Sequence, residues 1–336
     1  MGPGFCEIVG PPDWDRPQRP HGSRRAMAAS GDNFNPLHAP QSAAFEFTGQ
    51  IMNIAVTFLP RQERAPLPPI GFIGGGNMAS AIIGGLIKRQ VPAATFEVVE
   101  PQAEARERLR HDFGIAAQAE AGAALERCGV LVWAVKPQSF AQAAQAVRGL
   151  TKDALHLSVA AGIPSDSIAR WLATEQVVRA MPNTPALVGK GMTGLFARPA
   201  VDAAGRKMVE QVLEATGELL WVDAESALDA VTAVSGSGPA YVFYVIEAMT
   251  EAGVELGLTP EQAHRLAVGT FTGASTLAND ATEPPSVLRE RVTSKGGTTH
   301  AAITSLENAD VKAKFKAAIR AAHQRAAELG EEFGRG

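Results

Sequence analysis

A glycine-rich turn directly after a short apolar segment constrains the fold of this chain more than any other feature. The stretch Ile70–Ala79 reads IGFIGGGNMA and places G-x-G-x-x-A between a strand pattern and a helix pattern. Gly74 allows the tight turn, Gly76 lets a pyrophosphate approach the backbone, and Ala79 lets the helix and strand pack closely. The helix N-terminus offers free N–H groups to phosphate oxygens. The turn therefore predicts a dinucleotide site rather than a merely structural bend.

The segments around and after this turn alternate between strand and helix patterns as far as about residue 223. Strands are expected near residues 69–73, 95–100, 130–135, 155–160, 176–181, 193–197 and 218–222. The run 130–135 is apolar throughout, which is typical of a central parallel strand covered on both faces. Strands that alternate with helices predict a doubly wound α/β sheet, so residues 67–231 are expected to form a Rossmann dinucleotide-binding domain.

Residues 232–334 carry only helical patterns and are expected to form an all-α domain. The helix expected over 239–257 is apolar nearly all round in its first half, which is typical of burial on several sides. Thr259 and Gln262 have the spacing of a capping box, and Ser286 and Asp310 are expected to begin two later helices. A region this apolar predicts an obligate dimer interface.

Residues 1–66 differ from the rest because prolines and glycines are frequent and periodicity is poor. We interpret them as a disordered or loosely ordered extension. A mis-assigned start is the alternative, since Met52 would begin a plausible shorter chain. A transit peptide fits less well because Asp13, Asp15 and Asp32 break the acid-poor pattern.

Composition excludes several classes of function. The only cysteines, Cys6 and Cys128, cannot form a disulfide framework, and the seven histidines lack metal-ligand spacing. A net charge of −4 gives no electrostatic case for nucleic acid or an anionic membrane as a partner. No apolar stretch is long enough to span a bilayer, and the start of the chain lacks the regions of a signal peptide. We therefore expect no metal, no membrane and a cytoplasmic location.

Two charged residues follow expected strands of the sheet, where ligands of this fold bind. Glu100 could accept hydrogen bonds from the adenine ribose and repel a 2′-phosphate, which would favour NAD. In the other interpretation it is a solvated strand-end residue, and Arg106 or Arg108 reaches the 2′-phosphate of NADP. Lys136 lies in the segment AVKP, 134–137, at the end of an expected strand, where a cation suits phosphate or ribose; otherwise it is an ordinary surface lysine.

At this point the sequence resembles the pyrroline-5-carboxylate reductase family. The resemblance is carried by six blocks in family order, which together span about residues 67–332. They are GFIGGGNM (71–78), AVKP (134–137), AAG (160–162), RAMPNTPA (179–186), SGSGPAY (235–241) and VTSKGGTT (292–299).

The resemblance implies reduction of 1-pyrroline-5-carboxylate to L-proline with NADPH or NADH. It also implies a homodimer formed by the C-terminal helical domain, often assembled further into decamers. The implied cofactor residues are Gly74, Gly75, Gly76, Asn77, Met78, Glu100, Ala134, Val135, Lys136, Pro137, Ala160 and Ala161. The implied substrate residues are Ser294, Gly296, Gly297, Thr298 and Thr299, with Thr299 as the hydrogen-bonding or proton-donating partner of the ring nitrogen.

The chemistry of the Ser294–Thr299 segment agrees with this resemblance. Glycines just before a helix expose N–H groups, and a helix N-terminus attracts the carboxylate of an imine carboxylate. A hydroxyl near the nitrogen can orient it or relay a proton, so no strong base is needed. His300 is adjacent in sequence but is interpreted as structural, because neighbours on a helix point about 100° apart.

The sequence departs from the family pattern at three positions. Lys295 replaces the usual proline of the substrate loop, which removes rigidity and adds a cation. Glu100 stands where many members have a small hydroxyl residue that serves NADP. Arg291 stands beside the loop, where some relatives carry asparagine.

Several motifs also have a structural interpretation. The turn MPNTP, 181–185, is as well explained by a structural role as by ligand contact. The segment SGSGP, 235–239, is interpreted as a helix start at the domain boundary, because it lacks the ending of a P-loop. Glu225 and Asp229 could face the substrate amine.

Two other functions were weighed against imine reduction. A β-hydroxyacid dehydrogenase needs a lysine on the interdomain helix, and residues 208–294 contain none. A non-catalytic nucleotide-binding protein would not need an intact Gly296–Thr299 loop.

Overall fold

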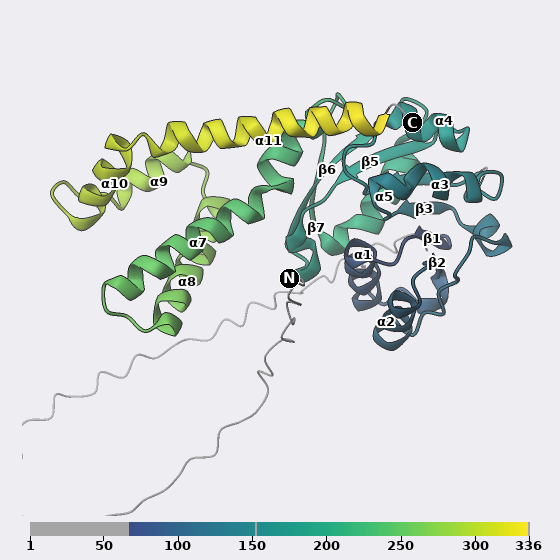
Figure 1. The fold of residues 1–336 in the computed structure, drawn as a ribbon, viewed down its shortest axis with the longest axis horizontal. Coiled ribbons are helices and arrows are strands. Elements are labelled where there is room, and N and C mark those ends of the chain that lie inside the picture. The colour runs from purple at the N-terminus through teal and green to yellow at the C-terminus, as the bar shows by residue number, and fades with distance from the viewer. Residues whose placement is uncertain (1–66, 152, 335–336) are drawn as a thin grey trace, which may run out of the picture. The chain divides into compact units, whose positions relative to one another are not determined.

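A seven-stranded sheet with helices on both faces forms the first part of the chain (Figure 1). The computed structural model describes residues 67–334 except residue 152, and these belong to one compact unit, Glu63–Gly336. The strands are β1 (Ile70–Ile73), β2 (Phe96–Val99), β3 (Val130–Trp133), β4 (Leu155–Ser158), β5 (Val177–Met181), β6 (Gly191–Ala197) and β7 (Gly217–Trp221). The helices between them are α1 (Asn77–Lys88), α2 (Ala103–Phe113), α3 (Pro137–Val147), α4 (Ser165–Leu172) and α5 (Ala203–Leu213). All seven strands that the sequence predicts are present.

The strand order is β2-β1-β3-β4-β5-β6-β7. The first five strands in this order pair in parallel, β6 pairs antiparallel with β5, and β7 pairs in parallel with β6. Ile73 pairs with Val99 on one side and with Trp133 on the other, so the carboxyl ends of β1, β2 and β3 meet at one edge. Ligands of doubly wound sheets bind at such an edge.

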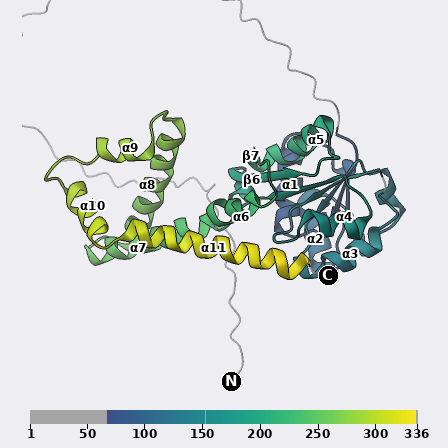
Figure 2. The same cartoon turned by 90° about the horizontal axis from the view of Figure 1, so that it is seen from above.

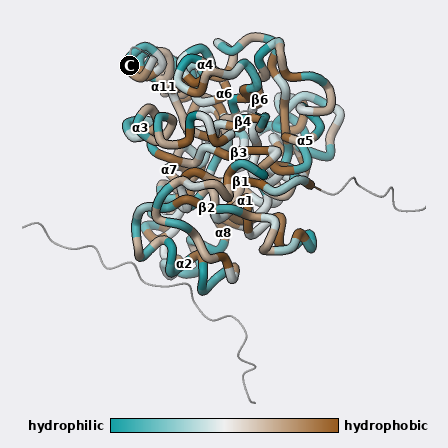
Figure 3. The backbone as a smooth tube through the Cα atoms, turned by 90° about the vertical axis from the view of Figure 1, so that its right-hand side faces the viewer, coloured by the Kyte–Doolittle hydropathy of each residue, from teal (hydrophilic) through white to brown (hydrophobic). Residues whose placement is uncertain are grey.

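The two faces of the sheet are covered by different helices, because strand side chains alternate between the faces. Val130 and Val132 belong to one core cluster with residues of α1, α2 and α5. Leu131 and Trp133 belong to the other, with residues of α3 and α4. All four residues of β3 are therefore buried, and Figure 3 shows hydrophobic colour along this part of the sheet. This explains the continuous apolar run of the sequence.

The C-terminal part of the chain is helical (Figure 2). Its helices are α6 (Ala227–Val231), α7 (Gly238–Glu255), α8 (Pro260–Asp280), α9 (Pro285–Arg291), α10 (Thr298–Asn308) and α11 (Val311–Gly334). The predicted capping box is confirmed, since Gln262 N donates to Thr259 Oγ1 (3.2 Å) and Thr259 N donates to Gln262 Oε1 (3.0 Å). A Cβ on Gly253 of α7 would lie 2.8 Å from Ala263 Cβ of α8, so these two small residues let α7 and α8 approach closely.

Helix α7 begins at Gly238, inside the segment 235–239 that was predicted as a helix start, and Thr232–Gly236 before it forms a turn of π-helix between α6 and α7. Two details of the helical part differ from expectation. Ser286 does not cap α9, because that helix begins at Pro285 and its N-cap is Pro284. Helix α7 has no buried residue within the single chain, so burial on several sides is not achieved by this chain alone.

The last helix contacts the sheet domain at a predicted block. Gly162 has φ +74°, and a Cβ there would lie 3.2 Å from Phe333 Cδ2 and 3.3 Å from Leu329 Cβ of α11. Ser167 Oγ of α4 also donates to the carbonyl oxygen of Gly334 (3.0 Å). The glycine of the AAG block therefore makes room for α11.

Other expectations concern boundaries and absences. The predicted extension 1–66 lies outside the described residues, and the boundary between 231 and 232 stays a prediction. Within the described part of the chain, no helix is long and apolar enough to cross a membrane. The same residues contain no group of three or more histidine, cysteine or acidic side chains arranged to hold a metal ion.

Candidate active site

The glycine-rich turn lies at the carboxyl edge of the sheet, between β1 and α1. Gly74 has φ +96°, and a Cβ there would lie only 2.6 Å from the carbonyl oxygen of Ala134. Gly76, in contrast, is exposed, and a Cβ there would meet no atom within 4 Å. Gly76 is the N-cap of α1 and provides no side chain to bond the N–H groups of the first turn. The turn thus combines a close backbone crossing with open space beside uncapped N–H groups, which fits a pyrophosphate.

Glu100 is the first residue after β2 and is only 8% exposed. Its Oε2 accepts a hydrogen bond from Gly75 N (2.7 Å), and its Oε1 accepts one from Gln102 N (2.8 Å). The interpretation of Glu100 as a solvated strand-end residue is therefore wrong. Arg106 Nη1 donates to the carbonyl oxygens of Glu100 (2.9 Å) and Pro101 (2.6 Å).

The AVKP and AAG blocks follow the next two strands. Ala134 N donates to the carbonyl oxygen of Ile73 (2.8 Å), so Ala134 lies beside the glycine-rich turn. Val135 is half-buried, and the exposed Lys136 is the N-cap of α3, whose first residue is Pro137. Ala160 N donates to Ser158 Oγ (3.3 Å) just after β4, and Ala161 is exposed. The structure thus brings the predicted cofactor residues to one edge of the sheet.

The predicted substrate loop connects α9 and α10. Gly297 N donates to the carbonyl oxygen of Ser294 (3.0 Å), and Gly296 has φ +77°, which a glycine adopts without strain. Gly297 is the N-cap of α10 without a side-chain cap, so the N–H groups of Thr298 and Thr299 are directed out of the helix start. Thr299 is half-buried, whereas Ser294, Lys295 and Thr298 are exposed. The arrangement suits a small carboxylate beside a hydroxyl group.

The loop and the nucleotide turn are not joined within the single chain. Among the described residues, the hydrogen bonds of the segment 292–299 are made to the loop itself, α9 or α10. The glycine-rich turn and the loop, which are the two predicted half-sites, are therefore not linked by a hydrogen bond among the described residues.

Two polar networks hold the segments that follow β5 and β7. Asn183 Nδ2 donates to Ser235 Oγ (3.1 Å), and Asn183 Oδ1 accepts from Met192 N (3.0 Å), so the MPNTP turn ties β6 to the π-helical turn. Glu225 forms an ion pair with Arg179 (2.6 Å), and its Oε2 accepts from Ser165 Oγ (2.6 Å). Sequence reasoning missed the Arg179–Glu225 pair, because the two residues are 46 positions apart; the structure supports a structural role for Glu225 rather than contact with a substrate amine.

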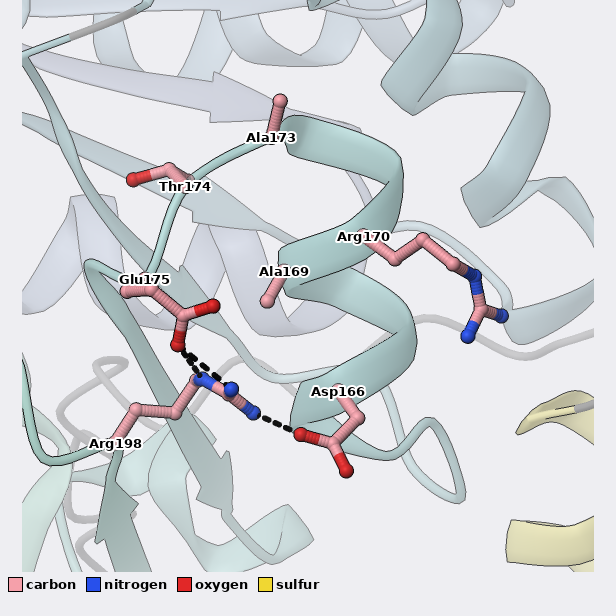
Figure 4. A pocket seen from close by; sticks show the side chains of 7 residues that line it. All are labelled: Asp166, Ala169, Arg170, Ala173, Thr174, Glu175 and Arg198. Atoms are coloured by element: carbon pink, nitrogen blue, oxygen red, sulfur yellow. Dashed lines mark hydrogen bonds and ion pairs between the residues drawn. The ribbon is translucent and has the colours of Figure 1, made fainter.

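A pocket at α4 is a weaker candidate for a ligand site (Figure 4). Its lining residues are Asp166, Ala169, Arg170, Ala173, Thr174, Glu175 and Arg198. Arg198 forms ion pairs with Glu175 (2.6 Å) and with Asp166, so its charge is already balanced by two carboxylates. No residue predicted for the site lines this pocket.

Two known families match separate parts of the chain. The family described as NADP oxidoreductase coenzyme F420-dependent matches residues 69–162, which include the glycine-rich turn and Glu100. The family described as pyrroline-5-carboxylate reductase dimerisation matches residues 225–329, which include the Ser294–Thr299 loop.

Similar proteins and structures cover most of the chain. The pyrroline-5-carboxylate reductase of Pseudomonas aeruginosa is 46% identical over 269 residues, which are 80% of this chain and 98% of that protein. The enzyme of that name from Arabidopsis thaliana is 34% identical over 276 residues, 80% of this chain and 99% of that protein. The structure of a pyrroline-5-carboxylate reductase from Coxiella burnetii has a TM-score of 0.74 at 36% identity, covering 78% of this chain and 98% of that one. The Plasmodium falciparum pyrroline carboxylate reductase with NADP bound has a TM-score of 0.72 at 26% identity, covering 80% and 100%.

Proposed function

The chain belongs to the pyrroline-5-carboxylate reductase family, and from this premise we propose how its residues perform the reaction. The protein is an NAD(P)H-dependent oxidoreductase that reduces 1-pyrroline-5-carboxylate to L-proline, the last step of proline biosynthesis. The observation that carries this function is that the same chain contains both an open glycine-rich turn after β1 and an intact glycine–threonine loop before α10.

The nucleotide is proposed to bind across the carboxyl edge of the sheet. Gly74, Gly75, Gly76, Asn77 and Met78 would hold the pyrophosphate, and Glu100 would contact the adenine ribose. Ala134, Val135, Lys136, Pro137, Ala160 and Ala161 would line the path of the nucleotide toward the substrate. The bound reduced nicotinamide supplies the hydride that the imine carbon receives.

The loop before α10 is proposed to hold the substrate. The uncapped N–H groups at Thr298 and Thr299, together with the Ser294 hydroxyl, would bind the carboxylate of the imine. Gly296 and Gly297 would let that carboxylate approach the backbone, and the exposed Lys295 adds a positive charge to the loop. Reduction adds a hydride to the carbon of the C=N bond and a proton to its nitrogen, and the Thr299 hydroxyl would donate the hydrogen bond that orients this nitrogen or relays the proton.

Replacement of Thr299 tests the proposed role. In the full-length protein, Thr299→Val keeps the shape of the side chain but removes the hydroxyl, so kcat should fall by about 10- to 100-fold. Thr299→Ser restores a hydroxyl and should recover most of the rate. The measurement is the steady-state rate of NAD(P)H oxidation with 1-pyrroline-5-carboxylate. A Thr299→Val enzyme with the kcat of the unchanged enzyme would remove Thr299 from the mechanism.

Assembly into a homodimer is proposed to bring the two half-sites together. The protein forms oligomers through its family's dimerisation region, and the exposed apolar side chains of α7 agree with this, since Phe243 is 64% and Tyr244 73% exposed in the single chain. Light scattering of the purified protein should give at least twice the 35.2 kDa mass of one chain. A single-chain mass at micromolar concentration would contradict the dimer.

Further assembly, location and partners remain proposals. We propose decamers built from dimers, as in the family that the sequence resembles, and a cytoplasmic location, which the low cysteine content of the chain supports. The net charge of −4 argues against nucleic acid as a partner. The proposed boundary between the Rossmann domain and the helical domain lies between residues 231 and 232.

A further inference from the structure

We infer that Glu100 makes NADH, rather than NADPH, the cofactor that this reductase selects. The inference rests on the proposed nucleotide site and assigns that site its specificity. It concerns only the adenosine end of the cofactor, which lies apart from the imine and its loop.

The Glu100 carboxylate is locked in place by the main chain on both sides. Its Oε2 accepts from Gly75 N (2.7 Å) in the nucleotide turn, and its Oε1 accepts from Gln102 N (2.8 Å) at the N-cap of α2. With only 8% of its surface exposed, the side chain has little freedom to turn away from a ligand. A fixed carboxylate therefore lies where the second strand ends, which is where this fold places the adenine ribose.

This position accepts a ribose but opposes a phosphate. A carboxylate oxygen has more than one lone pair, so oxygens that already accept from Gly75 and Gln102 can also accept from ribose hydroxyl groups. A 2′-phosphate would bring negative charge next to the carboxylate, in a region of reduced dielectric constant where repulsion is strong. It would also need N–H donors, and the Gln102 N–H is already bonded to Glu100.

The negative charge of the Glu100 carboxylate is not neutralised by an ion pair in the described part of the chain. Within residues 67–334 without residue 152, no cation forms an ion pair with its carboxylate; Arg106 bonds instead to the main-chain oxygens of Glu100 and Pro101. The exposed acid Glu104 adds a second negative charge in the first turn of α2. Arg106 is the group through which a 2′-phosphate could still be bound, so its contribution is measured separately.

The test measures the dissociation constants of NADH and NADPH by titration calorimetry, without imine. NADPH should bind at least about 10-fold more weakly than NADH to the unchanged protein. Glu100→Ser removes the charge and frees both N–H groups, so the two constants should become equal within about twofold or reverse in order. Glu104→Gln removes an equal charge from a residue without a contact to the turn, and should keep the original ratio within about twofold.

Further variants keep the inference falsifiable if Glu100→Ser does not fold. Glu100→Gln retains one acceptor oxygen and should lower the preference for NADH by about 10-fold. Tighter binding of NADPH than of NADH by the unchanged protein, lost in Arg106→Ala, would overturn the inference. So would a ratio that Glu100→Ser and Glu100→Gln both leave unchanged. Because no imine is present, failure of the reductase assignment would show as absent turnover with this ratio intact.

Discussion

Gly74 and Gly76 are two residues apart, yet the structure indicates a different reason for glycine at each position. At Gly74 both the positive φ of +96° and the carbonyl oxygen of Ala134 exclude a side chain in the folded protein itself. At Gly76 the φ of −73° suits any residue and the surrounding space is open. The first glycine therefore serves the fold, and the second leaves open space where the nucleotide is proposed to bind.

Replacement of each glycine by alanine distinguishes an effect on folding from an effect on nucleotide binding. Gly74→Ala should lower the free energy of unfolding by about 2–4 kcal/mol, because the methyl group meets backbone in a strained conformation. Gly76→Ala should leave unfolding within about 0.5 kcal/mol of the unchanged protein but weaken NADH binding by about 10-fold or more, because the methyl group occupies the approach of the pyrophosphate. Denaturant unfolding and calorimetry measure the two effects.

A control variant isolates the contribution of the positive φ. Gly114 has φ +69° but no atom within 4 Å of a Cβ, so Gly114→Ala should cost only about 1–2 kcal/mol. The account would be contradicted if Gly76→Ala bound NADH as tightly as the unchanged protein.

The structural role of a residue could be predicted where it depends only on its neighbours in the sequence. The glycines of the turn and the capping pair Thr259–Gln262 follow from backbone geometry within a few positions. The burial and hydrogen bonds of Glu100 could not be predicted, because its partners Gly75 and Gln102 come from two separate segments. The ion pair between Arg179 and Glu225 was hidden for the same reason.

At the scale of elements, a buried polar contact joins the two central strands β3 and β4. Trp133 Nε1 donates to His156 Nδ1 (3.0 Å), and His156 Nε2 lies 3.3 Å from the carbonyl oxygen of Thr151. The Trp133 bond requires an unprotonated Nδ1, so the remaining proton is on Nε2 and is donated to Thr151. Burial lowers the pKa of His156 from 6.5 to about 4, because the charged form loses hydration.

This lowered pKa predicts a loss of stability in mild acid. The unfolded chain binds a proton near pH 6.5, while the folded protein resists it until about pH 4. The contribution is therefore fully present above pH 6.5 and is lost as the pH falls to about 4, with a total on the order of 3 kcal/mol.

His156→Gln provides the matched comparison, since its amide can accept from Trp133 and donate to Thr151 without titrating. Unfolding free energies of both proteins, measured from pH 7 to pH 4, should diverge, with the unchanged protein losing more. Parallel curves would show that His156 does not control this loss.

Helices and strands could be predicted where their hydrophobic pattern corresponds to the faces that are buried in the structure. Strand β3 was recognised because both of its faces are buried, which makes every residue apolar. The π-helical turn at Thr232–Gly236 was not, because a single wider helical turn leaves no periodic signal over five residues. The apolar surface of α7 was recognised, but within the described chain none of its residues is buried.

At the scale of the whole molecule, the reaction needs two parts that the described chain keeps separate. The nucleotide is proposed to bind at the sheet edge, and the imine at the loop before α10. Pairing of subunits through the apolar surface of α7 and its neighbours is the proposed way to bring these parts together. Each part could be proposed from the sequence because it depends on a local motif, whereas no local motif gives the distance between them.

The most direct test of the reductase assignment is the rate at which the purified full-length protein oxidises NADH or NADPH with 1-pyrroline-5-carboxylate. We predict turnover that depends on the imine and forms one L-proline for each nucleotide oxidised. A folded protein that binds nucleotide yet forms no proline with either cofactor would contradict the account.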